Sequence, residues 1–100
     1  MQMNENLDAR RTLVVIPTFN DVALLSTIVE DVLALDGNYV PLVIDDGSSP
    51  RLYISDLPKG CLLFSLPTNM GLGMCIHIGL DHALKHGYDE FLRIDSDGQH

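Results

Sequence analysis

Short aliphatic and β-branched runs alternate along this chain with amphipathic segments at helical spacing. The apolar runs are TLVVIP, YVPLVI, CLLFSL and EFLRI, and helical patterns over 20–35 and 73–86 follow the first and the third. The stretch 49–60 predicts a loop with a short helix. Strands alternating with helices predict an α/β fold with a mostly parallel sheet of about four strands and flanking helices.

The two helical patterns each predict a buried face. For the first helix we expect Asn20 or Asp21 as the N-cap and an end at 36–38. Its expected buried residues are Leu25, Ile28, Val29, Val32 and Leu33. The second helix is expected to bury Ile76, Leu80, Ala83 and Leu84.

Charge and composition exclude several classes of protein. The formal net charge of −8 disfavours a nucleic-acid partner held by its phosphates. No apolar run approaches the roughly 18 residues of a membrane span, and no secretory signal is visible at the start. One domain over 12–100 is expected, after a polar lead over 1–11. Cys61 and Cys75 lack a CxxC spacing, so we expect reduced, buried thiols and a cytoplasmic protein; membrane association stays open for a full-length protein.

Polar side chains follow three of the four expected strands. Asp95 and Asp97 end the fourth strand, and at spacing i, i+2 both can face one site. Two close carboxylates repel one another, which either raises the pKa of one of them or favours a bound cation. Hard oxygen ligands favour Mg²⁺ or Mn²⁺. Gln99 can add a neutral oxygen. A solvated acidic turn is the alternative for this DSD pattern.

Two further patterns lie at the same expected edge, where open parallel sheets bind ligands. Asp45-Asp46-Gly47-Ser48 after the second strand indicates either a ligand cup or an Asx-type turn. The turn over 69–73, with Gly71 and Gly73, indicates either a phosphate site at a helix N-terminus or a tight packing turn. No GxGxxG pattern is present, which disfavours a dinucleotide site.

Acidic strand ends beside an anionic ligand imply a divalent cation between them. We therefore expect the carboxylates of the second and fourth strand ends to lie together around one cation. His82 and His86 have a spacing that zinc accepts, but Asp81 and Lys85 beside them favour a solvated surface.

In their order, IPTFND, VIDDGSS, NMGLGMCIHIGLDHAL and RIDSDGQH resemble the motifs of family-2 inverting glycosyltransferases with the GT-A fold. The resemblance is strongest to dolichol- and polyprenyl-phosphate sugar synthases and covers 12–100. It implies a Rossmann-like nucleotide-binding half and a UDP- or GDP-linked sugar donor. The implied acceptor is a polyprenyl phosphate or a glycan, which indicates cell-wall or glycan biosynthesis.

The resemblance also implies roles for single residues. Those expected to line the nucleotide-sugar site are Pro17, Thr18, Asn20, Asp21, Asp45, Asp46, Asn69, Gly71, Gly73 and Asp95. Within this set Asp45 would contact the nucleobase, and Asp21 stands where the family usually has a longer Glu. Asp95 and Asp97 would hold Mg²⁺ or Mn²⁺ on the diphosphate, joined by Gln99. The catalytic base of the family lies beyond residue 100, so none is assigned.

Members of this family are longer than this chain. Weak or no transfer is therefore expected from these residues alone, with self-association through exposed sheet edges. Two alternatives stay open. One is a non-catalytic module that binds nucleotide sugars. The other is a haloacid dehalogenase-like Mg²⁺-dependent phosphatase, since IDSDG is similar to a DxDG nucleophile loop, although that loop normally follows a first strand.

Overall fold

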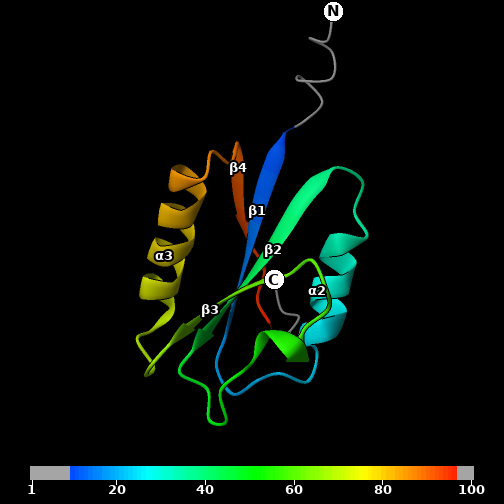
Figure 1. Cartoon of the computed structure of the whole chain (residues 1–100). Coiled ribbons are helices and arrows are strands. Elements are labelled where there is room, and N and C mark those ends of the chain that lie inside the picture. Colours follow the sequence, from blue (N-terminus) through cyan, green and yellow to red (C-terminus); the bar gives the residue numbers. More distant parts are fainter. Residues whose placement is uncertain (1–9, 97–100) are drawn as a thin grey trace, which may run out of the picture.

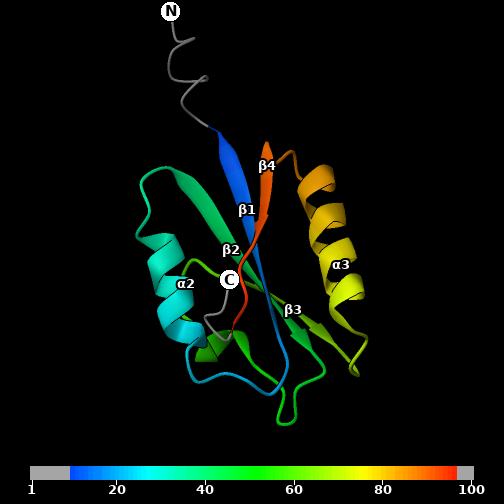
Figure 2. The same ribbon diagram turned by 180° about the vertical axis from the view of Figure 1, so that it is seen from behind.

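The computed structural model describes residues 10–96, which form a four-stranded parallel sheet with a helix on each face (Figures 1 and 2). The expected α/β class is confirmed. The elements in chain order are β1 (Arg11–Thr18), α2 (Leu25–Leu33), β2 (Asn38–Asp46), the short 3₁₀ helix η1 (Ile54–Asp56), β3 (Leu62–Leu66), α3 (Leu72–Lys85) and β4 (Glu90–Arg93).

The strand order β3-β2-β1-β4 reverses direction at β1. From β1 the chain runs outward to β2 and β3, and then returns to the other side of β1 as β4. Thr18 at the end of β1 pairs with Asp45, and Val15 pairs with Arg93 at the end of β4. Ligands of open parallel sheets bind where the strand order reverses. The carboxyl ends of β1 and β4 therefore mark the expected binding edge.

The sheet carries a separate core on each face because successive strand side chains point to opposite sides. On one face α2 packs on β1 and β2, with Val14, Ile16, Leu25, Val29, Val32 and Val43 in the core. On the other face α3 packs on the same strands, with Leu13, Val15, Leu42, Ile44, Cys75 and Ala83. Cys61 and Cys75 are free and buried, one in each core, as expected.

The expected start of the first helix was wrong. Its first residue is Leu25, and Leu24 occupies the N-cap position without a side-chain hydrogen bond. Asn20 does not cap the helix because its side-chain oxygen accepts a hydrogen bond from Ser49 instead. Leu25, Val29 and Val32 are buried as expected, whereas Leu33 is exposed.

The expected buried face of the second helix was also partly wrong. Cys75, Gly79 and Ala83 face the sheet, whereas Leu80 and Leu84 are 43% and 73% exposed. Small residues let α3 approach β1 closely: a Cβ at Gly79 would lie 2.5 Å from Val15 Cγ2. The close approach of α3 to the sheet therefore requires small residues on the buried face of the helix, and the larger Leu80 and Leu84 lie on the exposed face.

Within residues 10–96, neither helix combines the length and the apolar character that crossing a membrane requires.

Candidate functional site

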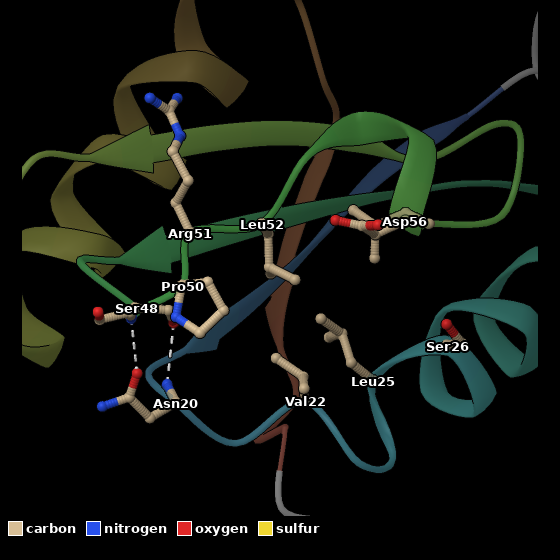
Figure 3. Close-up of a pocket in the computed structure, with 11 residues that line it drawn as sticks. Asn20, Val22, Leu25, Ser26, Ser48, Pro50, Arg51, Leu52 and Asp56 are labelled. Atoms are coloured by element: carbon tan, nitrogen blue, oxygen red, sulfur yellow. Dashed lines mark hydrogen bonds between the residues drawn. The ribbon is translucent and has the colours of Figure 1, made fainter.

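The loop that leaves β1 is joined to the loop that leaves β2. Asn20 adopts a left-handed backbone with φ of 56°, and its amide donates to Ser48 Oγ at 2.9 Å. Its side-chain oxygen accepts from the amide of Ser49 at 2.8 Å (Figure 3). Thr18, nearly fully buried, donates its hydroxyl to the carbonyl of Asp21 at 3.0 Å. Three of the expected site residues, Thr18, Asn20 and Asp21, thus form with Ser48 and Ser49 one rim at the carboxyl edge of the sheet.

Asp45, at the end of β2, is fully buried and points into the loop that follows it. Its Oδ1 accepts from the amide of Ser48 at 3.0 Å, and its Oδ2 accepts from the amide of Leu52 at 2.9 Å. This geometry favours the turn interpretation of the DDGS pattern. The expected contact between Asp45 and a nucleobase stays a prediction.

Asp46 points the other way, to the turn before α3. Its Oδ1 accepts from the amide of Met70 at 2.7 Å. Its Oδ2 accepts from the amide of Gly71 at 2.9 Å and from Asn69 Nδ2 at 3.0 Å. Only 5% of Asp46 is exposed.

The sequence predicted that the carboxylates at the ends of the second and fourth strands surround one cation. For Asp45 and Asp46 at the end of β2 this prediction was wrong. Asp45 and Asp46 point to different loops because consecutive strand residues face opposite sides of the sheet. In addition, β1 lies between β2 and β4, so the two acidic strand ends are not neighbours. The carboxylates of Asp45 and Asp46 are already bound by amide donors.

Asp95 follows β4 directly and lies on the side of the sheet where the strand order reverses. The amide of Ile94 before it donates to the carbonyl of Val15 at 3.0 Å, which holds the exit of β4 against β1. Asp95 Oδ1 lies 3.5 Å from Arg93 Nε in a partly exposed ion pair. Asp97 and Gln99 lie outside the described residues, and residues 10–96 contain no cluster of three or more metal-ligating side chains. The cation pair stays a prediction.

The first turn of α3 is open to the outside. Gly71 precedes the helix with φ of 96° and provides no side-chain cap. A Cβ added at Gly71 or at Gly73 would meet no atom within 4 Å. The unpaired amides that begin every α-helix therefore lie here beside glycines with open space around them. This openness is compatible with the expected phosphate contact, which stays a prediction.

A hollow of about 350 Å³ lies beside this rim, on the α2 side of the β1 and β2 exits. Val22, Leu25 and Leu52 point into it, and Asn20 and Ser48 border it (Figure 3). Sequence reasoning did not include its other polar residues, Ser26, Ser49, Arg51 and Asp56. They come together only once the 48–57 loop folds against α2. Phe19, also missed, is 46% exposed on the β1 loop, and an aromatic residue within PTFND was the available signal.

The buried thiols are poor nucleophiles. Burial raises the pKa of Cys61 to about 11. Burial, with a further contribution from the Asp46 carboxylate, raises the pKa of Cys75 to about 11. The rings of His82 and His86 lie 4.3 Å apart at the other end of α3, and partial burial and then the neighbouring His86 lower the pKa of His82.

Residues 13–100 match the family model for glycosyl transferase family 2. The chain belongs to this family of glycosyltransferases, and its parallel sheet with flanking helices is consistent with a Rossmann-like half of the GT-A fold.

Among curated proteins, the chain is 34% identical over 98 residues to the polyprenol monophosphomannose synthase of Mycolicibacterium smegmatis (strain ATCC 700084 / mc(2)155). The alignment covers 91% of this chain and 37% of that protein, so the chain spans a little over a third of this relative. No solved structure gives a significant match.

Proposed function

We propose that this chain is the donor-binding part of a glycosyltransferase that uses a nucleoside diphosphate sugar and a divalent cation, and that inverts the anomeric centre. The main support for this proposal is that hydrogen bonds join three loops at the carboxyl edge of the sheet. There, hydrogen bonds of Asn20 connect the β1 exit to the β2 loop, and Asp46 connects the β2 end to the start of α3. Pro17, Thr18 and Asp21 belong to the same β1 exit.

The acceptor in this proposal is a polyprenyl phosphate, and the transferred sugar is mannose. Support comes from the name of the relative, which is a polyprenol monophosphomannose synthase. A phosphate acceptor is already an anion and needs little help from a base. Inversion would follow from a single displacement at the anomeric carbon. Calorimetry with each donor distinguishes a UDP-linked from a GDP-linked sugar.

Asp95, Asp97 and Gln99 are proposed to hold Mg²⁺ or Mn²⁺. Carboxylate and amide oxygens suit these hard cations. Asp45 and Asp46 are less suited as ligands, because they are buried and each of their oxygens already accepts at least one backbone N–H. When bound, the cation would neutralise the charge that develops on the departing nucleoside diphosphate.

The proposal includes weak or absent transfer by this chain alone, because it spans little more than a third of its relative. It also includes self-association through the outer strands of the described sheet. Leu62 and Phe64 on β3 and Leu92 on β4 are exposed apolar residues on these strands, and such edges template further strand pairing. The two free cysteines favour a cytoplasmic location.

Isothermal titration calorimetry with UDP-mannose and GDP-mannose, with and without Mn²⁺, tests the proposal. We expect one of the two to bind only with the metal, and Asp97→Ala to abolish that binding while the circular dichroism spectrum is retained. Metal-dependent binding without transfer in a protein extended to the length of its relative would favour the non-catalytic module. Absence of metal-dependent binding would contradict both. The phosphatase alternative is disfavoured by the family match and by a DSD motif that follows β4 and not β1.

A further inference from the structure

We propose that Asp46 is a positioning residue for the nucleotide site: its carboxylate sets the 69–71 turn and the start of α3, and it does not read the nucleobase. The inference rests on the proposed function for the identity of the ligand. The part of the inference that concerns the 69–71 turn does not depend on the identity of that ligand.

The first support is the donor set around the carboxylate. Two consecutive backbone amides, those of Met70 and Gly71, donate to different oxygens of Asp46 at 2.7 and 2.9 Å. Asn69 Nδ2 adds a third donor at 3.0 Å. Hydrogen bonds to an ionised acceptor are the strong ones, and a carboxylate accepts on both oxygens. An asparagine in this place would turn one NH₂ group toward an N–H donor.

The second support is the contact between Gly47 and the same turn. Gly47 has φ of 81°, and a Cβ there would lie 2.4 Å from the carbonyl carbon of Thr68 and 2.5 Å from the nitrogen of Asn69. The end of β2 therefore touches the turn through backbone atoms. Only a glycine leaves the turn close enough for the preceding carboxylate to reach its amides.

The third support is that the helix start lacks another anchor. Gly71 at the N-cap position makes no side-chain cap, and the space around Gly71 and Gly73 is open. A carboxylate at a helix N-terminus is also favoured by the helix dipole. Asp46 thus holds the inner side of the turn, while its outer side remains free for a ligand.

Amide hydrogen exchange measured by NMR in the full chain tests this role of Asp46 by comparing Asp46→Asn with Asp45→Asn. We expect Asp46→Asn to accelerate exchange at Met70 and Gly71 by about tenfold or more, and to leave Ser48 and Leu52 within about twofold of the parent. Asp45→Asn should show the converse pattern, because its carboxylate accepts from Ser48 and Leu52. Unchanged exchange at Met70 and Gly71 in Asp46→Asn would overturn the inference.

Titration with UDP and with GDP, both with Mn²⁺, separates positioning from base recognition. Loss of a positioned turn should weaken binding of the nucleotide that the parent prefers and should not improve binding of the other, and where both Kd values are measurable their ratio should stay within about twofold. A ratio that changes tenfold would show that Asp46 reads the base and would overturn the proposal. If the parent binds neither nucleotide, the proposed function fails, and the exchange pattern still decides whether Asp46 sets the turn.

Asn69→Ala covers the case in which Asp46→Asn does not fold. This variant removes one of the three donors and leaves the carboxylate with both backbone amides. We expect exchange at Met70 and Gly71 to rise by about two- to fivefold, with a loss of affinity for the nucleotide that the parent prefers. Unchanged exchange, or a selective loss for one nucleotide where both Kd values are measurable, would contradict the inference.

Discussion

The side-chain oxygen of Asn20 accepts a 2.8 Å hydrogen bond from the backbone amide of Ser49, across the gap between the exits of β1 and β2. The amide of Asn20 donates in turn to Ser48 Oγ. The bonded partners are 28 and 29 residues apart in the chain, so these two hydrogen bonds hold the β1 and β2 loops in one arrangement. Because Asn20 also has φ of 56°, one residue supplies both the backbone bend and the connection.

Replacing Asn20 separates these two contributions. Asn20→Gly keeps the left-handed backbone accessible and loses the side-chain bond, so we expect a loss of about 1 kcal/mol in the free energy of unfolding. Asn20→Ala also places an alanine in the left-handed backbone conformation, which is unfavourable for a residue with a Cβ. We therefore expect it to lose about 2 kcal/mol in the free energy of unfolding. Urea denaturation followed by circular dichroism measures both. Equal stability of Asn20→Ala and the parent would contradict this account of the rim.

Gly47→Ala should be among the most damaging single changes at the site. Its φ is 81°, and the new methyl group would collide with the backbone of Thr68 and Asn69, so we expect a loss of about 2–4 kcal/mol. Gly87→Ala is the matched control, with φ of 71° and no atom within 4 Å of the added Cβ. It should lose only about 1 kcal/mol. Similar urea midpoints for the two variants would show that the backbone contact at Gly47 matters little.

Gly79→Ala tests the close approach of α3 to the sheet. The added Cβ would lie 2.5 Å from Val15 Cγ2 and 3.0 Å from Phe91 Cε1. We expect a loss of about 1–3 kcal/mol from overpacking, despite the better helix propensity of alanine. Leu84→Ala on the outer face of α3, where Leu84 is 73% exposed, should change stability by no more than about 0.5 kcal/mol. The opposite order of the two thermal midpoints would contradict the assigned buried face.

The buried thiols predict a loss of stability at alkaline pH. The pKa of Cys61 and that of Cys75 are both raised from 9.0 to about 11, so each native thiol keeps its proton where the unfolded chain has lost it. Their contribution is fully present below pH 9 and is lost as the pH rises toward 11. Urea midpoints measured between pH 8 and pH 11 should therefore fall.

A Cys61→Ala, Cys75→Ala variant provides the control for this pH dependence, since tyrosine and lysine also titrate at high pH. Its urea midpoint should fall less steeply over the same interval, although the variant is less stable at pH 8 because both cysteines are buried. If the urea midpoints of the variant and the parent fell with the same slope between pH 8 and pH 11, the thiols would not be the cause of the loss of stability at alkaline pH.

Much of the architecture could be predicted from local pattern. The apolar runs predicted all four strands, and the helical spacing predicted both helices to within a few residues at most of their ends. The start of α2 could not be predicted, because Asn20 is a good cap by type and its partner Ser49 is distant in the sequence. The buried face of α3 was mispredicted because the sizes of side chains favoured leucines, whereas close packing against Val15 favoured Gly79.

The sequence by itself determined that strands would alternate with helices, and that polar residues would follow the strands at one edge of a parallel sheet. Hydrophobic periodicity and the positions of Gly, Asp and Asn carry that information locally. Only the tertiary structure decided which loops supply the amide donors to Asp45 and Asp46, and that β1 separates β2 from β4. These outcomes depend on strand order and on amide donors supplied by distant segments, which a local pattern does not encode.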